Sequence, residues 1–111
     1  AYEDMKIYLS HHPKLPTAFC VINDIIAFGV MKALKEFGYK IPEDVSLIGF
    51  DNMPFCEIMS PQLTTIDILK REMGEMAVRL ILAKIQKTYN YPLKIQLSTS
   101  LRERESVMKI I

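Results

Sequence analysis

The chain has 111 residues, of which 50% are hydrophobic and 24% are charged, and its formal net charge is +1. These values are ordinary for one globular domain, and they exclude a disordered tail or a disulfide-rich scaffold. Basic and acidic residues are interspersed and no apolar run approaches the roughly 18 residues of a membrane span, so neither a nucleic-acid surface nor a membrane partner is predicted.

The first elements in chain order are a short helix, a strand and a longer helix. Apolar residues at helical spacing predict the short helix over Tyr2 to His12, which two prolines follow. The compact apolar run at residues 17–22 predicts a strand that leads directly into Asn23 and Asp24, two residues that favour a helix cap. An apolar stripe then predicts a helix over residues 25–37.

The segment at residues 41–52, IPEDVSLIGFDN, predicts a turn, a buried strand and polar groups where the strand ends. With the preceding strand and helix it forms a unit long enough for a right-handed crossover, so the two strands should be parallel neighbours. Their carboxyl ends then share one edge of the sheet. The pair Asn23 and Asp24 and the pair Asp51 and Asn52 are therefore predicted to lie side by side at that edge.

This edge is the predicted ligand site of the chain. In open α/β sheets, ligands bind in the crevice outside the carboxyl ends of the strands, where acidic and amide side chains can bond to a polar small molecule. There is a simpler alternative for each residue, since Asp51 and Asn52 can cap the next turn and Asn23 can cap the helix.

The second half of the chain predicts one helical turn, a third strand, a long helix and two final strands. The turn is expected at residues 54–59, and the strand, LTTI, at residues 63–66. The helix at residues 69–85 is apolar on most of its surface, so it is expected to fold onto the sheet or to pack against another copy. Alternation predicts a strand at residues 93–98, and another is possible at residues 101–107.

Four stretches in this order carry a family resemblance: TAFCVINDIIAFGVMKALKEFGYKIPEDVSLIGFDN, SPQLTTI, MGEMAVRLIL and LSTSLRERESV. Together they closely resemble the carboxyl-terminal part of bacterial transcription regulators of the lactose and galactose repressor family (LacI/GalR). The resemblance implies an α/β fold, a parallel-sheet lobe of a type I periplasmic-binding-protein-like effector domain in three αβα layers. Most of the first lobe and the DNA-binding helix-turn-helix domain are expected to lie outside these residues.

The resemblance also implies function and partners. Family members sense a small molecule, here expected to be a sugar or sugar derivative, form homodimers in the cytoplasm and bind operator DNA through the amino-terminal domain. The Asn of the family's NDxxA motif and the Asp of its GFD motif commonly contact the effector, and these fall on Asn23 and Asp51. The helix at residues 69–86 would pack in the other lobe of the intact protein.

Less distinctive residues receive family roles by the same resemblance. The family often has a polar residue and a proline after LTT, whereas here Ile66 is followed by Asp67, which can substitute as an effector contact. Family dimers bury the helix after NDxxA and the segment after GFD, which suggests as interface residues Phe28, Met31, Phe55, Ile58 and Met59. The alternative for each of these is a place in the core or ordinary surface exposure.

Other functions are weaker alternatives. His11 and His12 lie beside a proline without a nucleophile motif, so neither catalysis nor a metal or other cofactor is predicted. Cys20 and Cys56 lie in apolar stretches, where a free thiol behaves as a small hydrophobic residue, and they favour a reducing, intracellular setting. Because the chain starts at Ala1 without an initiator Met, at what looks like the middle of a helix, we expect a piece of a longer protein. A periplasmic-type sugar receptor for transport shares the lobe architecture and stays an alternative.

Overall fold

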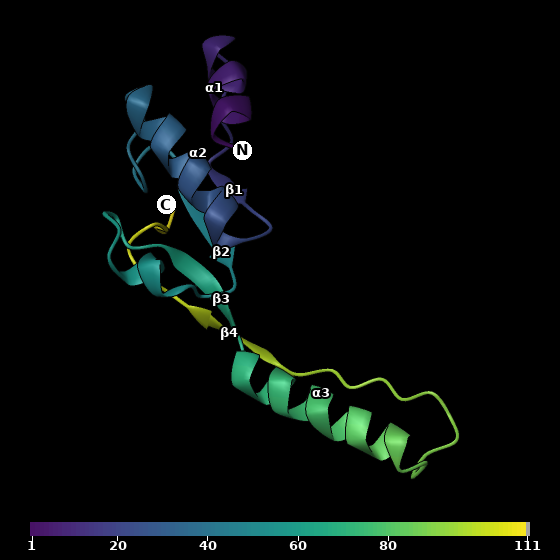
Figure 1. The fold of residues 1–111 in the computed structure, drawn as a ribbon. Helices are drawn as coiled ribbons and strands as arrows, with labels where there is room; N and C mark the ends of the chain where they lie inside the picture. The colour runs from purple at the N-terminus through teal and green to yellow at the C-terminus, as the bar shows by residue number, and fades with distance from the viewer. Residues whose placement is uncertain (111) are drawn as a thin grey trace. The chain divides into compact units, whose positions relative to one another are not determined.

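The computed structural model describes residues 1–110, which divide into two compact units. Unit 1 comprises Ala1–Asp67 together with the chain from Ser100 onward, and unit 2 comprises Ile68–Thr99. In chain order the elements are α1 (Tyr2–Ser10), β1 (Ala18–Cys20), α2 (Asp24–Glu36), β2 (Ser46–Phe50), η1 (Pro54–Glu57), β3 (Thr64–Ile68), α3 (Lys70–Ile85) and β4 (Thr99–Arg102) (Figure 1).

The strands of the described chain form one four-stranded sheet in the order β1-β2-β3-β4. The β1–β2 and β2–β3 pairs are both parallel, which confirms the predicted α/β class and the predicted crossover through α2. Ala18 pairs with Ser46 at the start of the first pair, and Ile48 pairs with Thr64 at the start of the second. The carboxyl ends of β1, β2 and β3 therefore share one edge of the sheet.

Local sequence explains where α2 begins and ends. Asn23 has an extended backbone, and its side-chain oxygen accepts a hydrogen bond of 2.8 Å from the amide of Ile26, which confirms the predicted cap. Gly38 follows the helix with a φ of 82°, a conformation that L side chains rarely adopt. The apolar side of α2, including Ala27 and Leu34, is fully buried.

Helix α1 packs against α2 (Figure 1). The hydroxyl of Tyr2 donates a hydrogen bond of 2.6 Å to Glu36, and the ammonium groups of Lys6 and Lys32 lie 4.9 and 4.4 Å from the Tyr2 ring centroid. The bond to Glu36 raises the pKa of Tyr2 above its ordinary value. Leu9 of α1 is 1% exposed, so the short helix belongs to the core.

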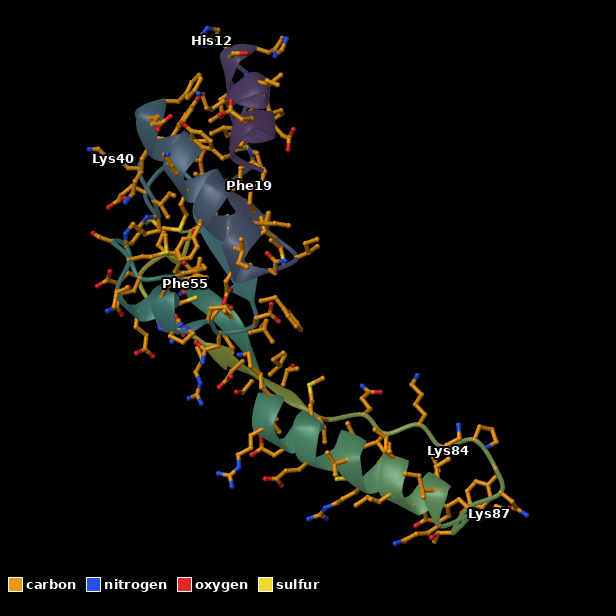
Figure 2. All side chains as sticks on the ribbon, viewed as in Figure 1. His12, Phe19, Lys40, Phe55, Lys84 and Lys87 are labelled. Atoms are coloured by element: carbon orange, nitrogen blue, oxygen red, sulfur yellow. The ribbon has the colours of Figure 1, made fainter. Side chains whose placement is uncertain are left out.

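The hydrophobic core of the described chain lies in unit 1. Its buried members come from both helices, from β2 and from the segments flanking the strands, namely Met5, Leu9, Ala27, Val30, Met31, Ala33, Leu34, Ile41, Val45, Leu47, Cys56 and Leu63. Phe55, labelled in Figure 2, and Phe19 are partly buried against this cluster. Cys20 is exposed, unlike its predicted role as a small hydrophobic residue, because the alternation of β1 turns it away from the core.

Unit 2 contains α3 and the irregular segment that follows it. No residue of α3 is buried, and Val78, Ile81 and Ile85 are each more than half exposed. Lys84 and Lys87 lie at the carboxyl end of this helix (Figure 2). The cover predicted for α3, by its own sheet, by another copy or, in the intact protein, by the other lobe, stays a prediction.

The strand predicted at residues 93–98 is wrong. These residues have no regular structure, and β4 begins only at Thr99 and ends at Arg102, so it overlaps the strand considered at residues 101–107 in just two residues. A strand requires a neighbour that supplies backbone hydrogen-bond partners, and β3, which pairs with β4, ends at Ile68. Among the described residues, no helix combines the length and apolar character needed to cross a bilayer.

Candidate functional site

Three of the predicted site residues lie at or just beyond the carboxyl ends of three adjacent strands. The β1–β2 register sets Ala18 opposite Ser46, and β1 ends at Cys20 and β2 at Phe50, so Asn23 and Asp51 both follow the carboxyl ends of neighbouring parallel strands. The β2–β3 register sets Ile48 opposite Thr64, a difference of 16, so its continuation sets Asp51 opposite Asp67. Asn23 and Asp51 follow β1 and β2, and Asp67 is the residue before the last one of β3. All three side chains, one amide and two carboxylates, are half-buried. We call these three residues the rim.

The backbone turns sharply at the middle of the rim. Asp51 has a φ of 109° and Asn52 a φ of 49°, in the region that residues other than glycine rarely occupy. The amide of Asp51 donates to the carbonyl of Ile66 at 2.9 Å, which holds it beside β3. Strained backbone of this kind persists where surrounding structure over-determines it, and it concentrates at binding sites.

Asp24 has a different role from the predicted ligand contact. Its side chain is 0% exposed, so it does not face a crevice. One carboxylate oxygen accepts from the hydroxyl of Thr65 at 2.6 Å, and the other accepts from the amide of Met53 at 2.8 Å and the thiol of Cys56 at 3.1 Å. Asp24 thus ties the start of α2 to β3 and to the segment after β2, and the α2 amino terminus favours its negative charge.

The glycine of the GFD motif makes room for this carboxylate. A Cβ on Gly49 would collide with an oxygen of Asp24 and would lie 3.1 Å from a methyl group of Leu63. The backbone of β2 can therefore approach the Asp24 carboxylate only because residue 49 has no side chain.

The thiol of Cys56 is a hydrogen-bond donor rather than a reactive group. Burial raises its pKa to about 12, and the hydrogen bond to Asp24 and the charge of that carboxylate act in the same direction. The protonated thiol can therefore donate to Asp24 throughout the physiological range.

Asn52, also predicted to face a ligand, forms hydrogen bonds with other residues of unit 1. Its side-chain oxygen accepts from the guanidinium of Arg104 at 2.8 Å, and its backbone N–H donates to the hydroxyl oxygen of Thr65 at 3.3 Å. Arg104 also donates to the carbonyl of Leu63 at 2.9 Å and to Glu57 at 3.0 Å. The sequence reasoning assigned no role to Arg104 or Thr65, although the LRERES stretch that contains Arg104 was part of the resemblance.

Ser106 is a further structural residue that the sequence reasoning missed. It is fully buried, donates to the carbonyl of Leu47 at 2.6 Å and accepts from the amide of Thr64 at 2.8 Å. It therefore bridges β2 and β3. Asp67 of the rim accepts from Arg102 of β4 at 2.9 Å, so β4 holds the third rim side chain in place.

The predicted interface residues divide into two groups. Met31 is 1% exposed and belongs to the core, which removes it from any interface. Ile58 is 85% exposed, while Phe28, Phe55 and Met59 are half-buried. The rings of Phe28 and Phe55 lie 4.0 Å apart between centroids, so α2 and η1 contact each other through them.

No group of acidic, His or Cys side chains within residues 1–110 has the arrangement needed to hold a metal ion. A cavity of about 360 Å³ in unit 1 is lined by Thr17, Asp44 and Met108 among others, near the amino-terminal ends of the strands. It is therefore distinct from the rim, which lies at the carboxyl ends.

A family model described as a periplasmic binding protein-like domain matches residues 1–107. The HTH-type transcriptional repressor PurR of Vibrio vulnificus is 39% identical to the chain over 95 residues, which are 86% of this chain and 28% of the repressor. The chain thus spans less than a third of the length of this curated relative.

Solved structures agree with this similarity. A LacI family transcriptional regulator from Enterococcus faecium with bound ribose has a TM-score of 0.82 and 34% identity, covering 96% of this chain and 38% of the other. The lac repressor dimer bound to operator and the anti-inducer ONPF has a TM-score of 0.87 and 29% identity, covering 97% of this chain and 32% of the other.

Proposed function

Because the chain belongs to the periplasmic binding protein-like domain family, in the form found in LacI-family transcriptional regulators, we propose that it senses a small-molecule effector for such a regulator. The regulator would act in the cytoplasm as a homodimer and would bind operator DNA through other parts of the protein. Relatives named as repressors, rather than as transport receptors, support regulation over the alternative of a periplasmic sugar receptor.

The observation that supports the proposal is that the three rim residues lie at or just beyond the carboxyl ends of three neighbouring parallel strands. Carboxylates of Asp51 and Asp67 accept hydrogen bonds from hydroxyl or N–H groups, and the amide of Asn23 can donate as well as accept. Several acceptors at one edge of the sheet suit a molecule that presents several donors. A sugar or sugar derivative has that character, and the ribose bound to the Enterococcus faecium regulator supports this choice.

The cap bond of Asn23 limits its role. Its oxygen accepts from Ile26, so the NH₂ group is the part of the amide that remains to donate to an effector. Asp51 is thus proposed as the main acceptor for the effector, with Asn23 as a donor beside it and Asp67 as a second acceptor.

A thermal-shift and calorimetric titration of the chain, with any residues that flank it in its natural polypeptide, tests the effector site. The panel contains ribose, lactose, cellobiose and purine bases. We expect a sugar to raise the melting temperature, and Asp51→Asn to weaken its affinity by about tenfold or more, because a bond to a charged acceptor is lost.

Asp44→Asn is the matched control for this change. Asp44 is exposed and accepts from the amide of Lys40 at 2.7 Å, so the same chemical change removes a charge away from the rim. Equal affinity for the sugar in Asp51→Asn and the parent protein would contradict the site. Stabilisation by purines alone would contradict the sugar-like effector.

For dimerisation we propose a surface centred on Ile58, with the half-buried Phe28, Phe55 and Met59 around it. An apolar side chain that is 85% exposed is the best candidate for burial by a second copy. Sedimentation velocity of Ile58→Asp should show a shift from dimer to monomer, whereas Ile7→Asp, at a side chain 60% exposed on α1, should not. An unchanged dimer in Ile58→Asp would contradict this surface.

A further inference from the structure

The segment at residues 51–57 runs from Asp51 of the rim to the end of η1. Side chains from outside the segment hold it at several points. Near its start, the amides of Asn52 and Met53 donate to Thr65 and Asp24. Near its end, the Cys56 thiol donates to Asp24, and Glu57 pairs with Arg104. The connection between the rim and η1 is therefore bound along its length.

Asp24 is the residue that joins these points. One carboxylate oxygen receives both the Met53 amide and the Cys56 thiol, three residues apart, so it fixes the beginning of η1 relative to the end of β2. The second oxygen receives the Thr65 hydroxyl, whose own oxygen accepts from Asn52. A displacement of Asn52 and Met53 relative to β3 and the start of α2 would strain their hydrogen bonds to Thr65 and Asp24.

The surroundings of Asp24 strengthen its hydrogen bonds. The carboxylate is fully buried, and Gly49 lets it lie directly against β2. Hydrogen bonds to a charged acceptor away from water are stronger than neutral ones, and loss of one partner leaves a buried group unsatisfied. The raised pKa of Cys56 keeps the thiol in its donating form.

We propose that Asp24 is the positioning residue of the rim and makes residues 51–57 a rigid connection between Asp51 and η1. On this view an effector that shifts Asp51 shifts Ile58, at the carboxyl end of η1, with it. The link to effector binding rests on the proposed function, whereas the anchoring itself can be measured without any ligand.

The test is amide hydrogen exchange on the whole chain, comparing Asp24→Ala with the parent protein. We expect the amides of Met53 and Ile58 to exchange about tenfold faster or more in Asp24→Ala, because their segment loses its acceptor. The amides of Val21 and Leu47, which donate to the carbonyls of Ile48 and Ser106, should keep the parent rates. Asp24→Asn, which retains one oxygen acceptor, should restore part of the protection.

A thiol measurement provides a second readout in a Cys20→Ser background, which removes the exposed cysteine. Alkylation of Cys56 should be slow in the parent background and about tenfold faster or more in Asp24→Ala. Asp44→Ala, which removes the exposed carboxylate that accepts from Lys40, is the matched control and should change neither measurement.

Three results would overturn the proposal. Parent-like exchange at Met53 in Asp24→Ala would show that Asp24 does not hold the segment. Equally faster amide exchange at Met53 and Leu47 would mean that Asp24 contributes only to global stability. Faster exchange at Met53 but not at Ile58 would contradict the proposed rigid link between Asp51 and η1. If Asp24→Ala does not fold, Asp24→Asn is compared with the parent protein instead. Amide exchange should then be faster at Met53 and Ile58 only, by a smaller factor.

Discussion

Unit 1 and unit 2 are both rich in apolar residues, but they use them differently. In unit 1 the apolar faces of α1, α2 and β2 meet, and Leu34 and Leu47 are 0% exposed. In unit 2, α3 is a helix of 16 residues without a buried side chain. Apolar patterning thus indicated where helices form in both units, whereas burial depends on which other elements are present to pack against them.

The largest expected effect comes from deleting equivalent leucine side chains in the two units. Leu34→Ala in α2 should lower the free energy of unfolding by about 2–5 kcal/mol, because it leaves a cavity in the core. Leu82→Ala in α3, where the side chain is 50% exposed, should cost much less. Urea denaturation measures both changes. An equally large loss for Leu82→Ala would mean that α3 is covered in solution, as the resemblance predicted.

Two arginines provide the next comparison. Arg104 has a side chain 10% exposed and donates to Asn52, Leu63 and Glu57, so Arg104→Ala should cost about 1.5–3 kcal/mol through the groups left unsatisfied. Arg71 of α3 is 87% exposed and pairs only with Glu75 among its described ion pairs. Arg71→Ala should therefore change the urea midpoint very little. Similar losses for the two variants would contradict the difference between the units.

Substitution of two glycines by alanine should change the free energy of unfolding in opposite directions. Gly49→Ala should destabilise by about 1–3 kcal/mol, because its methyl group collides with the Asp24 carboxylate. Gly74 lies within α3 with nothing near its Cβ position, so Gly74→Ala should stabilise by about 0.5–1 kcal/mol through helix propensity. Thermal unfolding followed by circular dichroism measures both. A stable Gly49→Ala variant would contradict the close approach of β2 to Asp24.

The last comparison concerns pH and reports on unit 1 alone, since both cysteines lie there. Burial raises the pKa of Cys56 from 9.0 to about 12, so above pH 9 the unfolded chain releases this proton while the folded chain keeps it. The contribution is complete below pH 9 and is lost as the pH rises toward 12. In a Cys20→Ser background, Cys56→Ser should therefore show a shallower fall in unfolding free energy over this range. Parallel curves would contradict the raised pKa.

Local signals in the sequence were sufficient for much of the fold. Asn23 caps α2 as its residue type predicted, and the apolar run before Asp51 is β2. The shared carboxyl edge of β1 and β2 followed from the crossover rule, because two parallel neighbours bring their carboxyl ends together. These predictions relied on residues near one another in the chain or on a general rule of topology.

The errors arose where a residue's partner is distant in sequence. Asp24 was predicted to face the crevice, whereas it bonds to Met53 and Thr65. These bonds span 29 and 41 residues, so no local pattern reveals them. Arg104 was missed for the same reason, since its bond to Asn52 spans 52 residues. Met31 shared the apolar character of an interface residue, and only packing distinguishes the two.

The positive φ angles of Asp51 and Asn52 limit which side chains the proposed effector site can have at its centre. At 109° and 49°, these positions accept glycine, asparagine or aspartate far more readily than a β-branched or bulky side chain. Selection for another molecule would therefore find few usable substitutions at the centre of the edge. New preferences are expected to arise first at its flanks, at Asn23 and Asp67, where the backbone imposes no such restriction.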